Sequence, residues 1–471
     1  KTSKLMIVGR SAELQELRSL LAADESQFVA VYGRRRVGKT FLIREAFEYR
    51  FTFQHTGIYN MNMPEQLDAF RDSLYDAGMK RAAKPKSWPE AFRLLARFID
   101  DNPTDGKKVI FIDEMPWMDT PRSNFVSALD HFWNGWATTR KDIILIICGS
   151  ATSWIIENVI MNYGGLHNRL TDQIAVQPFT LRECREYCKA KGLGYTDRQI
   201  LEAYMAIGGI PYYWSFMERG KSVAQNFDAL FFAPYGKLAH EFDALYASLF
   251  KKPKTHIATI TALAQKKMGL TREEILHNAH LSDNDDFSRA LRELEQCGFI
   301  RKFTALGRKT KGAVYQLMDN YTLFHFDFIR ENVNGDNHFW TSHLESTLHY
   351  GWAGRAFERV SLQHLPQIKK GLGIAAVSAN AHAWRSDEAQ IDLLIDRNDD
   401  TINLCEMKYS NAPYRLSDDE MSRLQNRRAS LLRETSTTKS VLLTMVTTYG
   451  LTPGGHSNDI HCQLTMEDLF Q

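Results

Sequence analysis

The segment that most constrains this chain is a glycine-rich turn, residues 33–40, which reads Gly-Arg-Arg-Arg-Val-Gly-Lys-Thr. It fits the pattern G-x-x-x-x-G-K-[ST] at every fixed position. The apolar run 28–32 before it predicts a buried strand, and 41–47 predicts the helix that follows. A strand, such a loop and a helix form an anion cradle, because backbone N–H groups and the positive end of the helix dipole face a bound phosphate. The alternative reading is a basic turn before a helix.

The loop predicts a site for ATP and Mg²⁺. Lys39 would reach the β and γ phosphates, and the hydroxyl of Thr40 would bind the metal ion. The nucleotide-binding residues expected in this loop are Gly33, Arg35, Arg36, Val37, Gly38, Lys39 and Thr40.

Two acidic residues after the apolar run 109–112 predict the metal side of the same site. The run puts Asp113 at the carboxyl edge of a buried strand, beside the phosphate loop. Asp113 would hold Mg²⁺ through water, and Glu114 would orient or deprotonate the attacking water. Arg169 is the expected arginine finger, with a surface salt bridge as the alternative. If it acts on a neighbouring copy, the protein must be a homo-oligomer.

Length and composition indicate a large globular protein. A chain of 471 residues suggests about three domains. A hydrophobic content of 44% with 24% charged residues is typical of soluble proteins, and a net charge of +2 does not indicate a nucleic-acid binder. The six cysteines form no C-x-x-C pair, which argues against a zinc site. Several of them lie in apolar runs, where a buried reduced thiol is the default, and this favours a cytoplasmic location. No apolar run reaches the roughly 18–20 residues of a membrane span.

The pattern of apolar runs divides the chain into five parts. A parallel α/β sheet is predicted over residues 1–178, because helical segments alternate with strands there. The strands are expected near 28–32, 51–56, 109–113, 143–149 and 173–177. A helical lid over 179–250 is interrupted at Gly208-Gly209-Ile210-Pro211. Residues 251–320 predict a winged helix, made of helices at 255–267, 271–280 and 283–297 and a hairpin of 299–305 with 312–318. A helical connector, 321–350, leads to an α/β domain at 351–471.

Four segments accompany the phosphate loop in order along the chain: Ile7-Val8-Gly9-Arg10, Phe111-Ile112-Asp113-Glu114, Cys148-Gly149-Ser150 and Gly208-Gly209-Ile210-Pro211. Together they resemble the archaeal-type ATPases of the AAA+/STAND assemblage over residues 5–230. The resemblance implies ATP hydrolysis, with Arg10 near the adenine, Ser150 as the γ-phosphate sensor and the Gly-Gly-x-Pro segment in the lid. Ser150 replaces the Asn common in AAA+ motors, which favours a switch-like ATPase.

The predicted winged helix has a mixed charge pattern. The wing is basic, through Arg301 and Lys302 on its first strand and Arg308, Lys309 and Lys311 in its turn. A basic wing could follow a DNA backbone without reading its sequence. The recognition helix carries several acids, so a packing module between domains is the equal alternative.

A second set of chemical groups lies near the C-terminus. The runs 389–396 and 401–408 predict a β-hairpin. Glu406 and Lys408 are two residues apart and share a face, and Asp392 can lie beside them on the neighbouring strand. Such a group can bind a divalent cation through oxygens and polarise an attacking water. The alternative is a strand with exposed charges.

The elements around this hairpin are expected to be a helix at 353–368, strands at 374–384, 440–448 and 459–462, and a helix at 416–434. With Asp392, Glu406 and Lys408, this order resembles the PD-(D/E)XK nuclease superfamily. The resemblance implies a restriction-endonuclease-like α/β fold and a site for Mg²⁺ or Mn²⁺ held by Asp392, Glu406 and Glu358. Gln390 would line the site. A nuclease fold that has lost catalysis is the alternative.

The leading hypothesis is an ATPase whose nucleotide state controls a metal-dependent nuclease acting on DNA, with RNA as the other substrate class. One alternative is a STAND-like switch with a catalytically silent C-terminal domain that binds nucleic acid or a partner. Another is a DNA-binding protein that acts through its winged helix.

Overall fold

The computed structural model describes residues 7–81, 83–161, 166, 169–250, 252–266, 268–303, 313–386 and 389–471. Within this structure the chain divides into two compact units. The first unit comprises Lys1–Pro178 with Ser248–Lys251, and the second comprises Phe179–Ala247 with Lys252–Gln471. No helix in the part of the chain that the structure describes is long and apolar enough to cross a membrane.

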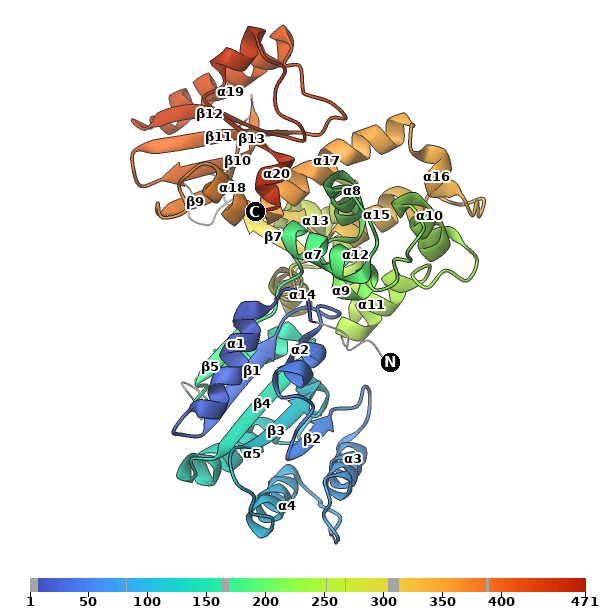
Figure 1. Ribbon diagram of the computed structural model, residues 1–471, viewed down its shortest axis with the longest axis vertical. Coiled ribbons are helices and arrows are strands. Elements are labelled where there is room, and N and C mark those ends of the chain that lie inside the picture. The colour runs from blue at the N-terminus through green and yellow to red at the C-terminus, as the bar shows by residue number, and fades with distance from the viewer. Residues whose placement is uncertain are drawn as a thin grey trace. The chain divides into compact units, whose positions relative to one another are not determined.

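The first unit is built on a five-stranded parallel sheet in the order β2-β3-β4-β1-β5 (Figure 1). Its strands are β1 (Gln27–Tyr32), β2 (Phe53–Thr56), β3 (Lys108–Asp113), β4 (Ile143–Gly149) and β5 (Asp172–Ala175). Each central strand is a continuous apolar run because helices cover both faces of the sheet. The predicted parallel α/β sheet is therefore confirmed.

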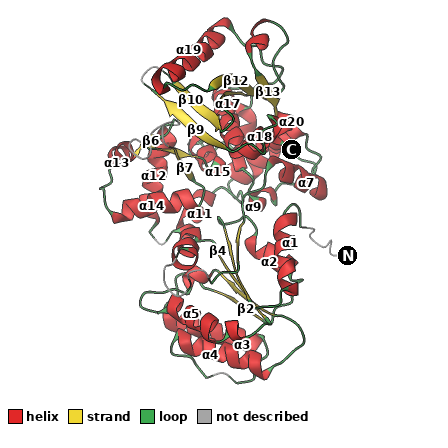
Figure 2. Cartoon of the chain, turned by 90° about the vertical axis from the view of Figure 1, so that its left-hand side faces the viewer, coloured by secondary structure: helices red, strands yellow, loops and turns green. Residues whose placement is uncertain are grey.

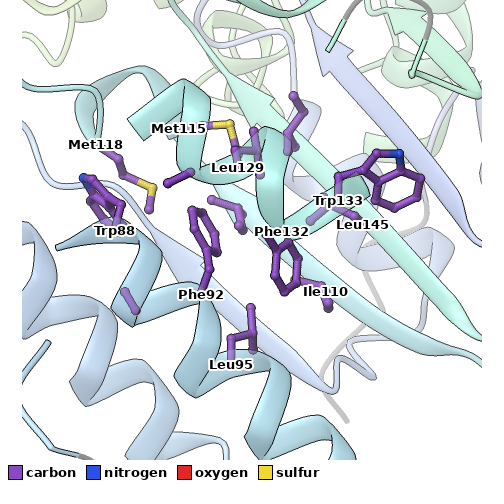
Figure 3. Close-up of a cluster of buried hydrophobic side chains, with 14 of the residues drawn as sticks. Trp88, Phe92, Leu95, Ile110, Met115, Met118, Leu129, Phe132, Trp133 and Leu145 are labelled. Carbon is purple, nitrogen blue, oxygen red and sulfur yellow. The ribbon is translucent and has the colours of Figure 1, made fainter. Parts of the chain in front are cut away.

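The helices of this unit are α1 (Ser11–Ser19), α2 (Lys39–Ala46), α3 (Met63–Asp76), α4 (Trp88–Asp101), α5 (Phe125–Gly135) and α6 (Thr152–Ile155). Helices α3, α4 and α5 lie together on one side of the sheet (Figure 2). Their aromatic side chains belong to one core with apolar residues of β3 and β4, and Figure 3 shows Phe132 beside Ile110 and Trp88 beside Met118. This core fixes the strands whose carboxyl ends carry the phosphate loop and Asp113.

The second unit begins with the helices of the predicted lid: α7 (Leu181–Lys191), α8 (Asp197–Ile207), α9 (Pro211–Trp214), α10 (Val223–Phe227) and α11 (Glu241–Leu249). Helix α8 ends directly before Gly208, and α9 begins at Pro211. Gly208 has a φ of +59°, and a Cβ on Gly209 would lie 1.8 Å from the carbonyl oxygen of Phe179. Gly208 is thus required because its backbone is left-handed, and Gly209 because the backbone of Phe179 lies too close for any side chain.

Residues 252–317 form a helix–hairpin module of three helices and a small antiparallel sheet in the order β6-β8-β7. Its elements are α12 (Pro253–Gln265), β6 (Leu270–Thr271), α13 (Arg272–Ala279), α14 (Asp285–Gln296), β7 (Ile300–Phe303) and β8 (Val314–Leu317). Arg308, Lys309 and Lys311, predicted to form the tip of a basic wing, lie outside the described residues.

The segment after this module is held by aromatic packing. It contains α15 (Asn320–Phe324), a π-helical turn (His325–Ile329) and α16 (Phe339–His343). Trp340 packs edge-to-face on Phe324, Phe328 and Trp352, with ring centroids 4.8–5.3 Å apart. Trp352 belongs to the next helix, so the aromatic cluster joins the connector to the C-terminal domain.

The C-terminal domain is a five-stranded mixed sheet in the order β13-β12-β11-β10-β9. Strands β9, β10 and β11 pair antiparallel, whereas β11, β12 and β13 pair parallel. Helix α19 packs on one face, where its apolar side chains join those of β10, β11 and β12 in one core. The elements are α17 (Thr347–Gln363), α18 (Leu365–Gly371), β9 (Ala379–Arg385), β10 (Gln390–Arg397), β11 (Thr401–Lys408), α19 (Asp418–Thr435), β12 (Ser440–Thr447), β13 (Cys462–Thr465) and α20 (Met466–Leu469).

Three sequence expectations in this domain were wrong in detail. The single helix at 353–368 is two helices that meet at His364, because Pro366 in the first turn of α18 cannot continue α17. The strand expected at 374–384 begins only at Ala379. The final strand lies at Cys462–Thr465, and a 3₁₀ turn at Gly455–Asp459 occupies part of the expected range.

Candidate functional site

The glycine-rich loop in the first unit runs from β1 into α2 and depends on its glycines. Gly33 has a φ of +139°, and a Cβ there would lie 2.3 Å from the carbonyl oxygen of Val176. Gly38 has a φ of +91° and immediately precedes the first turn of α2. Arg36 also has a positive φ, 72°, whereas Val37 is buried beneath the loop. The N-terminus of α2 is therefore presented to whatever anion the loop surrounds.

Lys39 lies inside this loop. Its side chain is buried, and Nζ donates to the carbonyl oxygens of Gly33 and Arg34 at 2.7 and 2.9 Å. Phosphate oxygens are acceptors of the same kind with full negative charge, so the ammonium group can exchange these carbonyls for them at little reorganisation cost. The position supports the predicted role of Lys39.

The two expected magnesium residues are in direct contact. The hydroxyl of Thr40 donates to Oδ2 of Asp113 at 2.7 Å, and Oδ1 of Asp113 accepts the backbone N–H of Glu114 at 2.8 Å. A hydroxyl oxygen and a buried carboxylate beside a phosphate cradle are donors that suit Mg²⁺. Thr40 and Asp113 would hold the ion, whose positive charge would offset the negative charge that develops during phosphoryl transfer.

Glu114 and Ser150 form a pair between β3 and β4. The hydroxyl of Ser150 donates to the carboxylate of Glu114, with oxygen–oxygen distances of 2.8 and 3.0 Å, and the backbone N–H of Ser150 donates at 3.2 Å. The backbone of Glu114 is left-handed, with φ 45°. The hydroxyl of Ser150, the predicted γ-phosphate sensor, thus holds the carboxylate of Glu114, which is predicted to orient the attacking water.

Arg10, Arg35 and Arg169, which were also predicted to serve the nucleotide site, differ in burial and in their contacts. Arg10 is buried, and its guanidinium donates to the carbonyl oxygens of Gln177, at 2.5 Å, and Val37. It therefore supports the loop from below through backbone contacts. Arg35 is half-buried, and Arg169 is exposed.

The second predicted site lies on the C-terminal sheet. Leu393 of β10 pairs with Cys405 of β11; Asp392 directly precedes the first of these residues and Glu406 directly follows the second, as expected for side chains near one another on antiparallel strands. Nζ of Lys408 lies 2.9 Å from Oε1 of Glu406, as expected for residues on one face of a strand. Gln390 donates to Asp392 at 2.9 Å. The pairing of β10 with β9 shifts between Ile391 and Leu394, a bulge of the kind that re-aims side chains beside functional sites.

Glu358, on α17, joins this group. Its pKa is raised to about 8, chiefly by burial, with further contributions from the neighbouring carboxylates of Asp392 and Glu406 and a hydrogen bond with Asp392, and against the opposing charge of Arg301. Crowded carboxyl groups of this sort are the arrangement that a divalent cation would relieve. The sequence-predicted residues Glu358, Asp392, Glu406 and Lys408 are thus brought together.

Two arginines at this site were not recognised from the sequence. Arg427, on α19, lies 2.7 Å from Oε2 of Glu406. Arg301 of β7 was expected on an exposed wing. Instead it is partly buried, donates to Gln316 at 2.8 Å, and interacts electrostatically with Asp392 and Glu358. Helical spacing could have identified Arg427, since it lies between the buried Leu424 and Leu431 on α19.

Carboxylate oxygens are the type of ligand that Mg²⁺ and Mn²⁺ prefer, but the side chains of this second site are not arranged as a metal site in the structure. As these side chains lie, both oxygens of Glu406 already contact cationic groups, Lys408 and Arg427. Among the residues that the structure describes, no group of three or more His, Cys, Asp and Glu side chains is arranged to hold a metal ion. All six cysteines are free thiols.

Comparison with known proteins identifies the first site. Residues 7–215 match the model of an ATPase domain found predominantly in Archaea. This segment is similar to ATPase domains of the archaeal type, and the similarity supports ATP as the nucleotide of its phosphate loop.

Relatives and solved structures extend beyond that domain. An uncharacterized protein of Methanocaldococcus jannaschii is 24% identical over 416 residues, which is 86% of this chain and 88% of that protein. The Walker-type ATPase of Pyrococcus abyssi has a TM-score of 0.50 at 16% identity, covering 69% of this chain and 97% of its own. The ORC2 protein of Aeropyrum pernix has a TM-score of 0.43 at 12% identity, over 70% of this chain and 96% of its own. The first of these structures shows a shared P-loop ATPase fold.

Proposed function

We propose that this protein is an ATPase whose nucleotide state controls a metal-dependent nuclease site on its C-terminal sheet, with DNA as the substrate. The single observation that carries the second half of the proposal is the convergence of Glu358, Asp392, Glu406 and Lys408. Three carboxyl groups would hold Mg²⁺ or Mn²⁺, which supplies Lewis acidity and an activated water. Lys408 would position that water or stabilise the charge that forms on the phosphate.

The sheet order supports this assignment. A helix, an antiparallel trio of strands, a helix and a parallel strand follow one another from α17 to β12. Asp392 directly precedes Leu393 on β10 and Glu406 directly follows Cys405 on β11, and Leu393 and Cys405 are paired. This is the arrangement expected for the PD-(D/E)XK nuclease superfamily, and the helix–hairpin module agrees with a winged helix.

Control by nucleotide is supported by contacts of α8, which belongs to the matched ATPase segment and also to the second compact unit. The hydroxyl of Tyr409, the residue after Lys408, donates to Glu202 on α8 at 3.0 Å. The aromatic ring of Tyr409 lies 6.0 Å from that of Phe357, the residue before Glu358. A movement of α8 would therefore act on the chain next to both Lys408 and Glu358.

Helix α7 gives a second contact of the same kind. The backbone N–H of Leu181 donates to Nε2 of His364 at 3.0 Å, while Nδ1 of His364 lies 2.8 Å from the carbonyl oxygen of Val360. These two bonds require a neutral imidazole with its proton on Nδ1. Burial lowers the pKa of His364 to about 4, so the bond persists at neutral pH.

The proposal is tested by incubating the full chain with supercoiled or single-stranded DNA and Mg²⁺ or Mn²⁺, with and without ATP. Cleavage should depend on the metal, vanish in Lys408→Ala and persist in Lys370→Ala, which removes an exposed lysine of the same domain. The Lys39→Ala variant should retain metal-dependent cleavage of DNA, but this cleavage should no longer respond to ATP. Cleavage that survives Lys408→Ala would refute the nuclease assignment.

The second candidate is an ATPase switch with a catalytically silent C-terminal domain. It is favoured by the two cations that already occupy the oxygens of Glu406. This alternative predicts ATP turnover, lost in Lys39→Ala, without cleavage of any DNA.

A further inference from the structure

The amide side chain of Gln66 joins the two loops that follow β2 and β3. Gln66 lies in the first turn of α3 and is fully buried. Its Nε2 donates to the carbonyl oxygens of Ile58, at 2.6 Å, and Trp117, at 3.1 Å, while its Oε1 accepts the N–H of Ile58 at 3.1 Å. Both amide hydrogens and the carbonyl oxygen of Gln66 are therefore used, and all three partners are backbone groups.

The backbone of Glu114 is in contact with both of these loops. A Cβ on Gly57 would lie 2.4 Å from the carbonyl oxygen of Glu114, so the loop after β2 approaches this residue closely. The same carbonyl oxygen accepts the N–H of Trp117 at 3.1 Å. Because Gly57 directly precedes Ile58, Gln66 holds both segments that contact the backbone of Glu114.

Glu114 needs such support because its backbone is left-handed, with φ 45° and ψ 38°. This conformation is unfavourable for a residue with a side chain, and it persists where the surrounding contacts impose it. The backbone conformation also sets the direction in which the side chain leaves the end of β3. Since Ser150 holds the carboxylate itself, Glu114 is fixed at both its backbone and its functional group.

We propose that Gln66 is a positioning residue for ATP hydrolysis, which maintains the left-handed backbone of Glu114 and so keeps its carboxylate directed at the attacking water. This assignment rests on the proposed ATPase activity. The hydrogen bonds of Gln66 within the described part of the chain go to Ile58 and Trp117 and none goes to the phosphate loop, so nucleotide affinity should not depend on it.

The test measures ATP turnover by the full chain. Gln66→Met keeps about the length of the side chain but loses all three hydrogen bonds, so kcat should fall roughly tenfold to hundredfold while KM for ATP changes less than about twofold. Ser73→Ala is the matched control, because the hydroxyl of Ser73, on the same helix, lies 2.9 Å from Nδ1 of His55. This variant also loses a hydrogen bond of α3, but its kcat should equal that of the wild type.

A double-mutant cycle separates positioning from a general loss of structure. If Gln66 acts through Glu114, adding Gln66→Met to Glu114→Gln should not lower the single-turnover rate below that of Glu114→Gln alone. Gln66→Glu serves if Gln66→Met does not fold. It keeps an acceptor for the N–H of Ile58 but loses both donors, and it should lower kcat with the same small effect on KM.

Each outcome decides the assignment. An unchanged kcat in the Gln66 variants, or a further loss of full size in the Glu114→Gln background, would overturn the role of Gln66 and leave the ATPase activity intact. A raised KM with unchanged kcat would also overturn it, because Gln66 would then support nucleotide binding. If the wild type shows no turnover that Lys39→Ala abolishes, the proposed ATPase activity and the role of Gln66 both fail.

Discussion

Replacing Gly209 with alanine should destabilise the second unit, because the added methyl group has no space. A Cβ at this residue would lie 1.8 Å from the carbonyl oxygen of Phe179 and 2.7 Å from its carbonyl carbon. The carbonyl oxygen also accepts the hydroxyl of Tyr204 at 2.8 Å, and the N–H of Phe179 donates to Gly209 at 2.6 Å. The atoms in the way are backbone atoms that are already hydrogen-bonded. The clash can therefore be relieved only if the backbone at Phe179 moves away from the backbone at Gly209, which breaks or weakens these hydrogen bonds.

The magnitude follows from these contacts. Forcing a methyl group into a packed site costs roughly 1–3 kcal/mol, and weakening a buried backbone hydrogen bond adds about 1 kcal/mol. The expected loss for Gly209→Ala is therefore about 2–4 kcal/mol. Gly194→Ala is the matched control: Gly194 has a φ of +72° but nothing within 4 Å of its Cβ position. That variant carries only the left-handed backbone cost of roughly 1–2 kcal/mol, partly offset by a less flexible unfolded chain.

Hydrogen exchange is the appropriate assay, because a chain with two compact units does not have one free energy of unfolding. Amides of α8 and α9 should exchange faster in Gly209→Ala than in the wild type by a factor that corresponds to the lost stability, roughly 30-fold or more at 2 kcal/mol. Gly194→Ala should change those amides by less. Equal protection in the two variants would refute the argument that backbone contact, rather than backbone conformation, requires Gly209.

Three further predictions concern the two sites. Lys39→Ala should abolish ATP binding, measured with a fluorescent analogue, while thermal unfolding of the protein changes little. Ser150→Ala should leave ATP affinity unchanged and reduce turnover about tenfold, since the carboxylate of Glu114 keeps one backbone donor but loses the hydroxyl that orients it; an unchanged turnover number would contradict this. Because the pKa of Glu358 is about 8 in the folded protein and near 4.5 when unfolded, the stability of the C-terminal domain should fall as pH rises from about 4.5 to 8. The protection of α17 amides against hydrogen exchange, corrected for the intrinsic pH dependence of exchange, measures this fall, and Glu358→Gln should remove it.

The first site could be predicted from the sequence because its chemistry depends on contiguous residues. The spacing of Gly33, Gly38, Lys39 and Thr40 fixes a backbone shape, and the apolar run before Asp113 fixes the strand edge at which that residue ends. Both signals are local, and neighbouring parallel strands bring them to the same edge of the sheet. The contact between Thr40 and Asp113 is the structural consequence.

The second site was only partly predictable, since its groups come from elements far apart in the sequence. The alternation of side chains in a strand was enough to place Glu406 beside Lys408. No local rule indicates that Arg301, in another module, lies near Asp392, or that Arg427 reaches β11 from α19. The wing prediction counted Arg301 as a surface charge because sequence alone does not reveal which face of a hairpin is covered. Some predicted ends of helices and strands were wrong for a similar reason. The break between α17 and α18 at His364 depends on Pro366 and on the contact of His364 with α7.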